Sequence, residues 1–226
     1  MWLSEETLGR VKNNMIFKDR QDAGQKLIQK LEKFKNSQET IVLGLPRGGV
    51  VTAFEISKEL NLPLDIIVTR KIGAPGNPEL AIGAITEIGE SVLDVALIST
   101  MRVSQDYVNQ EIKQETKEAN RRLSVYRGTR PPLNLQDKRV ILVDDGVATG
   151  YTMLAAIKSV RKKEAKEIII AVPVIALDTL KKIKREADEV IYLDSPISFW
   201  GISSFYENFD QIEDEEVIAL MKSKKI

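Results

Sequence analysis

Two adjacent carboxylates followed by a turn of small residues are the part of this chain best suited to chemistry. Asp144 and Asp145 directly follow the apolar run 140–143, which is typical of a buried strand. Ionised carboxylates accept hydrogen bonds from a sugar diol or bind Mg²⁺. Gly150 lets the backbone approach an anion, and a helix starting near Thr149 would offer unpaired N–H groups to a phosphate. The order therefore predicts a site for a phosphorylated sugar at a strand's carboxyl end.

The same pattern has simpler interpretations. A strand that ends in two acids and a glycine-containing turn also occurs as a plain connection between strand and helix, or as an acidic pocket like that of response regulators. The segment is not a Walker A loop, because no lysine follows the glycine in the required place. Its glycines also lack the spacing of a dinucleotide fingerprint. The pattern alone leaves a phosphate site and a structural turn open.

A second strand-to-helix turn lies at Gly44-Leu45-Pro46-Arg47-Gly48-Gly49. The arginine offers a planar set of donors suited to phosphate, and the two glycines permit close approach of the backbone. Further along, Arg70 and Lys71 precede a glycine- and proline-rich stretch, where two cations could neutralise a diphosphate. The alternatives are an ordinary tight turn and a surface loop with exposed bases.

Composition excludes several classes of mechanism. The chain has 226 residues, 43% hydrophobic and 29% charged, with no cysteine and no histidine. Disulfides, thiolate zinc sites, histidine-ligated metals and mechanisms based on a Ser-His or Cys-His pair are therefore excluded. The 33 basic and 33 acidic side chains cancel, so no overall field favours nucleic acid or a membrane surface. We expect neither partner, and the N-terminus shows no signal-peptide pattern, so a cytoplasmic location is expected.

Alternating strand and helix patterns predict an α/β fold with a mainly parallel, twisted sheet flanked by helices. The expected strands lie at 40–45, 64–69, 81–88, 91–98, 140–143, 167–172 and 189–193, and the expected helices at 19–34, 48–60, 103–126, 149–163 and 177–187. We expect a single domain over residues 1–226. Its core spans about 38–195, and the N-terminal helix (about 19–35) and the C-terminal segment (196–226) form a small hood.

The C-terminal segment concentrates aromatic residues. Phe199, Trp200, Phe205 and Tyr206 fall close together, and their rings could stack on a flat acceptor. The alternative is that most of them pack the terminal segments onto the core.

The run of four apolar residues, two acids and a turn containing Thr-Gly closely resembles the ribose-phosphate motif of type I phosphoribosyltransferases. The resemblance extends from about Phe17 to Val217 and is closest to an uncharacterised group of predicted phosphoribosyltransferases. It implies that phosphoribosyl pyrophosphate is the donor, with Asp144 and Asp145 near the ribose hydroxyls. The donor-binding set would be Asp144, Asp145, Gly146, Val147, Ala148, Thr149, Gly150, Tyr151 and Thr152.

By the same resemblance, the pyrophosphate would lie on Arg47, Gly48, Gly49, Arg70 and Lys71. The implied catalytic residues are Asp144, Asp145, Arg47 and Lys71. Mg²⁺ is the implied cofactor, held by the two aspartates through water. The acceptor would meet Phe199, Trp200, Phe205 and Tyr206, and residues 99–132 would close over the site.

The implied reaction transfers the phosphoribosyl group to a nucleobase-like or other nitrogen acceptor with release of pyrophosphate, in a homodimer. Ala148 stands where hypoxanthine-guanine-type enzymes carry an aspartate, so their acid–base route does not apply here. The acceptor stays open. A regulatory protein that binds the donor without catalysis, and a hydrolase-like or salvage enzyme with water or an amine as acceptor, are the alternatives.

Overall fold

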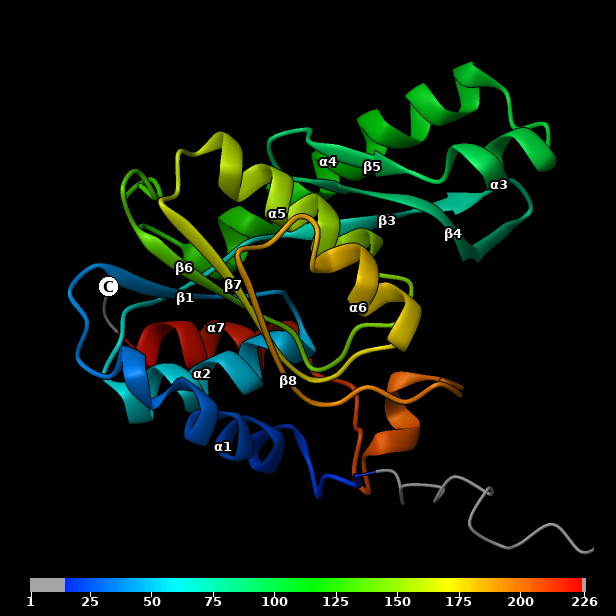
Figure 1. The fold of residues 1–226 in the computed structure, drawn as a ribbon. Coiled ribbons are helices and arrows are strands. Elements are labelled where there is room, and N and C mark those ends of the chain that lie inside the picture. Colours follow the sequence, from blue (N-terminus) through cyan, green and yellow to red (C-terminus); the bar gives the residue numbers. More distant parts are fainter. Residues whose placement is uncertain (1–14, 225–226) are drawn as a thin grey trace, which may run out of the picture.

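A five-stranded parallel sheet forms the centre of the molecule (Figure 1). The computed structural model describes residues 15–224. The strands are β1 (Thr40–Gly44), β2 (Leu64–Ile66), β6 (Arg139–Val143), β7 (Glu167–Val174) and β8 (Glu189–Asp194), in the order β2-β1-β6-β7-β8. All pair in parallel, so their carboxyl ends share one edge. The expected parallel α/β architecture is confirmed.

Helices cover both faces of this sheet, because its strands are apolar on both sides. In β6, Ile141 and Val143 pack in one cluster with residues from α1 (Arg20–Leu31), α2 (Gly48–Leu60), α7 (Asp214–Ser223) and the end of α4 (Gln105–Arg127). Val140 and Leu142 point to the other face, where α5 (Tyr151–Lys162) and α6 (Leu177–Ile183) lie. This arrangement fixes the strand ends from which the functional loops emerge.

A smaller antiparallel sheet extends beyond the central one (Figure 1). It consists of β3 (Thr69–Ala74), β4 (Asn77–Thr86) and β5 (Ser91–Leu93) in sequence order. Together with α3 (Val95–Thr100) and the first half of α4, these strands enclose their own apolar cluster around Ile72, Ile85 and Val108. The expected hairpin at Gly89-Glu90 is present, since β4 pairs with β5.

The sequence prediction differs from the structure in this smaller sheet. Arg70 and Lys71 lie within strand β3 and not in a loop, because the glycines and prolines that suggested a loop lie around the β3–β4 turn. The expected strand 91–98 ends at Leu93. There Asp94 accepts a hydrogen bond from the Leu97 amide at 2.9 Å and starts α3, so an N-cap replaces the strand continuation.

The two terminal segments pack against the body of the molecule. Helix α1 packs against α2, β7 and β8, and α7 packs against α2 and α4. Residues 195–213, which include the short helix η3 (Ile202–Phe205), and the starts of α1 and α7 lie near the functional loops. No helix within residues 15–224 has both the length and the apolarity needed to span a lipid bilayer.

Candidate functional site

Two strand-to-helix turns meet at the carboxyl edge of the sheet. Strands β1 and β6 are neighbours, and the Leu45 amide donates to the Val143 carbonyl at 2.9 Å. A Cβ placed on Gly49 would come within 2.8 Å of the Asp144 Cα, and one on Gly48 would lie 1.9 Å from Asp145 Oδ2. The β1–α2 turn therefore touches the acidic pair directly, and only glycine fits at these two positions.

The loop after the acidic pair ends in an open helix N-terminus. Gly150 has φ +84° and caps α5, and the first helical hydrogen bond runs from the Leu154 amide to the Gly150 carbonyl at 2.8 Å. The amides of Tyr151, Thr152 and Met153 precede that bond and so have no acceptor within the helix. The helix begins two residues later than expected. Oriented N–H groups of this kind bind phosphate.

Hydrogen bonds from neighbouring elements hold the loop in shape. The Val147 amide donates to Val174 at 2.9 Å, and the Thr179 hydroxyl donates to the Ala148 carbonyl at 2.5 Å. The Tyr151 hydroxyl donates to the carboxylate of Asp94, which links the loop to the smaller sheet. Burial and this bond raise the pKa of Tyr151 to about 12, so its proton stays in place at neutral pH.

The two aspartates have different surroundings. Asp145 is buried, with 8% of the residue exposed, and its Oδ2 accepts a hydrogen bond from Arg20 Nε at 2.6 Å. Asp144 is only partly buried, and its Oδ1 accepts from the Asp145 amide at 2.9 Å. Asp144 is therefore the more exposed of the two acids.

Sequence reasoning missed Arg20. Its Nη1 donates to the Asp210 carbonyl at 2.8 Å, and its guanidinium carbon lies 3.8 Å from the centre of the Phe209 ring. A signal was present in the sequence: Arg20 stands three, four and seven residues before Ala23, Gly24 and Leu27, on the helix face that packs inward.

The aromatic residues of the C-terminal segment pack against the loop that carries the acidic pair. Phe205 and Tyr206 are buried, at 1% and 7% exposure, in a cluster with Phe17 and Val174. The Tyr206 hydroxyl donates to the Asp145 carbonyl at 2.5 Å. This corrects the expectation that these two rings stack on an acceptor, because their faces are covered by protein.

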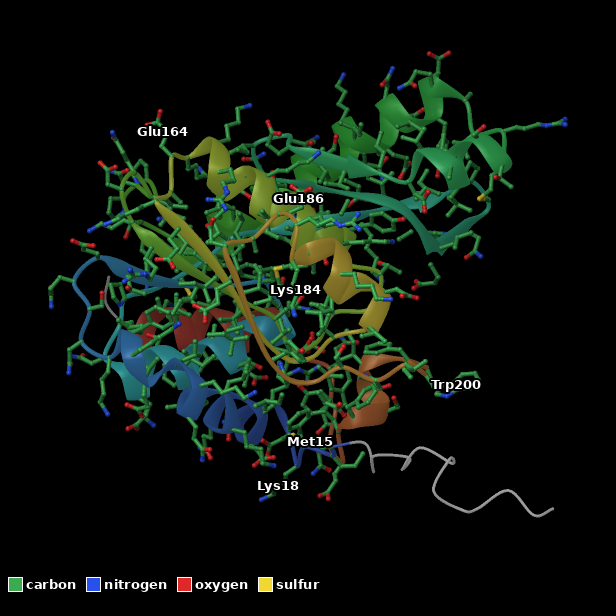
Figure 2. The ribbon with its side chains drawn as sticks, in the orientation of Figure 1. Met15, Lys18, Glu164, Lys184, Glu186 and Trp200 are labelled. Carbon is green, nitrogen blue, oxygen red and sulfur yellow. The ribbon has the colours of Figure 1, made fainter. Side chains whose placement is uncertain are left out.

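Phe199 and Trp200 differ from those two rings. Phe199 is partly buried, with its ring centre 5.2 Å from that of Phe205. Trp200 is 92% exposed, and Figure 2 shows it extending from the C-terminal segment away from the body. Of the four expected acceptor residues, Trp200 has the most accessible ring.

The expected pyrophosphate residues spread over two elements. The Arg47 guanidinium lies 3.4 Å from a Glu213 oxygen and 3.6 Å from one of Asp214, so it reaches the start of α7. Arg70 Nε donates to Glu115 of α4 at 2.6 Å. Lys71 is exposed and, because side chains alternate along a strand, points to the other face of β3. The structure places Arg47, Gly48 and Gly49 beside the acidic turn and gives Arg70 a partner elsewhere.

Burial and mutual repulsion set the protonation of the acidic pair. Burial, with the neighbouring charge of Asp145, raises the pKa of Asp144 well above its usual range. Burial also raises the pKa of Asp145, and the Arg20 guanidinium opposes that shift. The site therefore favours one carboxylate charge offset by arginine over two free charges.

Comparison with known proteins identifies the kind of domain. A family model described as a phosphoribosyl transferase domain matches residues 12–210. A Mycobacterium tuberculosis protein named "Putative phosphoribosyl transferase Rv0571c" is 38% identical over 206 residues, which are 91% of this chain and 46% of that protein. The chain thus spans about half the length of the curated relatives it matches. A uracil phosphoribosyltransferase of Mycoplasma genitalium is 28% identical over 102 residues, which cover 41% of this chain and 50% of that one.

A solved structure has the same fold over nearly its whole length. The crystal structure of the protein TT1426 from Thermus thermophilus matches with a TM-score of 0.77 at 38% identity, covering 93% of this chain and 99% of that one. Together with the family model over residues 12–210, this match confirms the expected type I phosphoribosyltransferase-like fold.

Gly48→Ala should disrupt the acidic pair through crowding alone. The new Cβ would lie 1.9 Å from Asp145 Oδ2 and 2.7 Å from Arg20 Nε, so the ion pair must move. We expect a loss of roughly 2–4 kcal/mol in the free energy of unfolding. Gly76→Ala is the control: its Cβ meets nothing within 4 Å, and only its φ of +73° opposes alanine, at about 1 kcal/mol. If urea unfolding shows the same loss in the free energy of unfolding for Gly48→Ala and Gly76→Ala, the proposed crowding is contradicted.

Asp144→Asn should stabilise the ligand-free protein above acidic pH. An unfolded aspartate titrates near about pH 3.9, and the folded pKa is raised. Keeping Asp144 protonated in the folded protein stabilises it. This stabilisation is fully present below the pKa of the unfolded state and is lost as the pH rises through the pKa of the folded state. Asparagine avoids that loss, so the variant should be more stable than the parent by about 1 kcal/mol or more at pH 8, with a smaller gap at pH 4.

Urea unfolding at the two pH values measures this difference. Asp178→Asn, with 89% of its side chain exposed, is the matched control, and it should change stability by less than about 0.5 kcal/mol. If the difference in stability between Asp144→Asn and the parent is the same at both pH values, the raised pKa of Asp144 is contradicted.

Proposed function

We propose that this chain, which belongs to the phosphoribosyl transferase domain family, transfers a 5-phosphoribosyl group from phosphoribosyl pyrophosphate to a nitrogen acceptor with release of pyrophosphate. The observation that carries the proposal is the open start of α5 beside Asp144, at the carboxyl edge of a parallel sheet. A 5-phosphate fits the unpaired amides, and ribose hydroxyls fit the adjacent acidic pair.

The bond between the anomeric carbon and pyrophosphate breaks, and pyrophosphate leaves with the electron pair. The acceptor nitrogen forms the new bond to that carbon and gives up its proton to pyrophosphate or solvent. Positive charge develops on the ribose in between, next to the acidic pair, which stabilises it. No covalent intermediate with the protein is needed, in keeping with a chain that lacks cysteine and histidine.

The oxygen ligands that this site offers suit an Mg²⁺ ion that is also bound by the substrate. Among residues 15–224, no cluster of three or more acidic side chains could enclose a metal. Mg²⁺ commonly binds one or two carboxylates together with water and substrate phosphates, and Asp144 is the more exposed of the two acids. The ion would neutralise charge on the pyrophosphate when bound.

The acceptor we propose is flat and base-like. The similarity of part of this chain to a uracil phosphoribosyltransferase supports that class, and the exposed Trp200 ring offers a stacking surface. Ala148 carries no acid or base, so the acceptor must be able to lose its proton without help from that position. The homodimer and the cytoplasmic location stay predictions.

Arg47→Ala should weaken binding of pyrophosphate selectively. We propose that the Arg47 guanidinium exchanges its long contacts with Glu213 and Asp214 for the charged leaving group, a stronger partner for its planar donors. Calorimetry should show about a tenfold rise in the dissociation constant for pyrophosphate, and little change for ribose 5-phosphate. An equal loss for both ligands would contradict the assignment.

The proposed activity is tested by adding phosphoribosyl pyrophosphate and Mg²⁺ with a panel of nucleobases and small amines, and measuring pyrophosphate release. Release with one acceptor, reduced at least about tenfold in Asp144→Asn, is the expected result. Donor binding without release from any acceptor would favour the regulatory alternative. Failure to bind the donor at all would overturn the proposal.

A further inference from the structure

Helix α5 begins without a side-chain cap. Its N-cap residue is Gly150, which has φ +84° and no side chain that could accept from the first amides. A capping serine, threonine or aspartate would occupy amides that an anion needs. The glycine leaves these amides open, but the first turn of the helix then lacks the contact that usually holds it. Because uncapped helix ends fray, another contact must fix this turn if its amides are to face one ligand.

The side chain of Tyr151, the first residue of α5, supplies such a contact. Its hydroxyl donates to one carboxylate oxygen of Asp94. The other carboxylate oxygen accepts from the Leu97 amide at 2.9 Å, and the Asp94 amide donates to the Ile82 carbonyl of β4 at 2.8 Å. The Tyr151 hydroxyl and the Leu97 amide lower the pKa of Asp94, so its carboxylate is charged at neutral pH. Asp94 is thus a charged acceptor that is itself fixed to the smaller sheet and to α3.

The smaller sheet contacts α5 near both ends of the helix. Helix α5 packs against β3, β4 and β5 (Figure 1). The bond between Tyr151 and Asp94 lies at its N-terminus. Near the other end, Lys162 Nζ and Glu90 Oε1 are 2.6 Å apart, about 16 Å further along the helix. Of these two contacts, the first lies next to the open amides and the second does not.

We propose that Asp94 is a positioning residue that holds the first turn of α5 through the Tyr151 hydroxyl, so that the smaller sheet helps to form the site for the donor's 5-phosphate. The inference rests on the proposed function and deepens it by giving the smaller sheet a role in binding the phosphate end of the donor. Its consequence is selective. Affinity for a phosphate at the start of α5 depends on Asp94, and affinity for pyrophosphate at the Arg47 turn does not.

Calorimetry with ribose 5-phosphate and, separately, with pyrophosphate tests this inference. Tyr151→Phe removes the hydroxyl and keeps the ring, so it should weaken binding of ribose 5-phosphate at least about fivefold, with little change for pyrophosphate. Asp94→Asn keeps a side chain that caps α3 but removes the charge, so it should also weaken binding of ribose 5-phosphate. The double variant should lose no more affinity than Tyr151→Phe does, because both substitutions break the same bond.

Lys162→Gln is the matched control. It breaks the ion pair with Glu90, which joins the same helix to the same sheet away from the open amides. It should leave the affinity for both ligands unchanged.

The outcomes separate the possibilities. A loss confined to ribose 5-phosphate, shared by both single variants and not additive in the double variant, supports positioning through this bond. Unchanged binding of ribose 5-phosphate, equal losses for both ligands, or losses that add would overturn the inference and leave the proposed function intact. A loss in Tyr151→Phe alone would also overturn it, because the hydroxyl would then act without Asp94. If the unsubstituted chain binds neither ligand, the proposed function fails and the inference fails with it.

Discussion

The buried contact between Arg20 and Asp145 constrains more of this molecule than any other single interaction. It joins the first turn of α1 to the loop after β6, and Gly48 must be glycine to make room for it. A buried carboxylate is costly without a partner, so the loop is stable in this form only with the segments that supply and enclose the arginine. The aromatic cluster around Tyr206 serves the same end, because its hydroxyl holds the Asp145 carbonyl.

The central architecture could be predicted because its sequence signals are local. Strand β6 is a pure apolar run, and the residues that follow it are acids and a helix start, which is the usual order at a parallel strand's carboxyl end. Neighbouring strands with the same pattern then place the Arg47 turn beside the acidic turn. These two loops were predicted from sequence and meet in the structure.

The parts that could not be predicted depend on contacts distant in sequence. Strand β3 has a glycine- and proline-rich continuation, and only its pairing with β4 makes it a strand. Arg20 is separated from Asp145 by 125 positions, so the ion pair has no local pattern. Phe205 and Tyr206 have rings that suit stacking on a ligand or packing in a core, and composition cannot distinguish the two. The presence of Phe17 and Val174 around them decides for the core.

The balance of charges around the acidic pair bears on the chemistry proposed for the site. A donor that carries a phosphate and a pyrophosphate is strongly anionic, and two free carboxylates in its pocket would repel it. Because the pKa of Asp144 is raised and Asp145 pairs with Arg20, the acidic pair carries little uncompensated negative charge. The amides at the start of α5 favour an anion at the adjacent position. The fold thus presents a helix end suited to an anion beside a pair of acids whose charge is largely offset, a combination suited to a ligand that is negative at its ends and becomes positive at its centre.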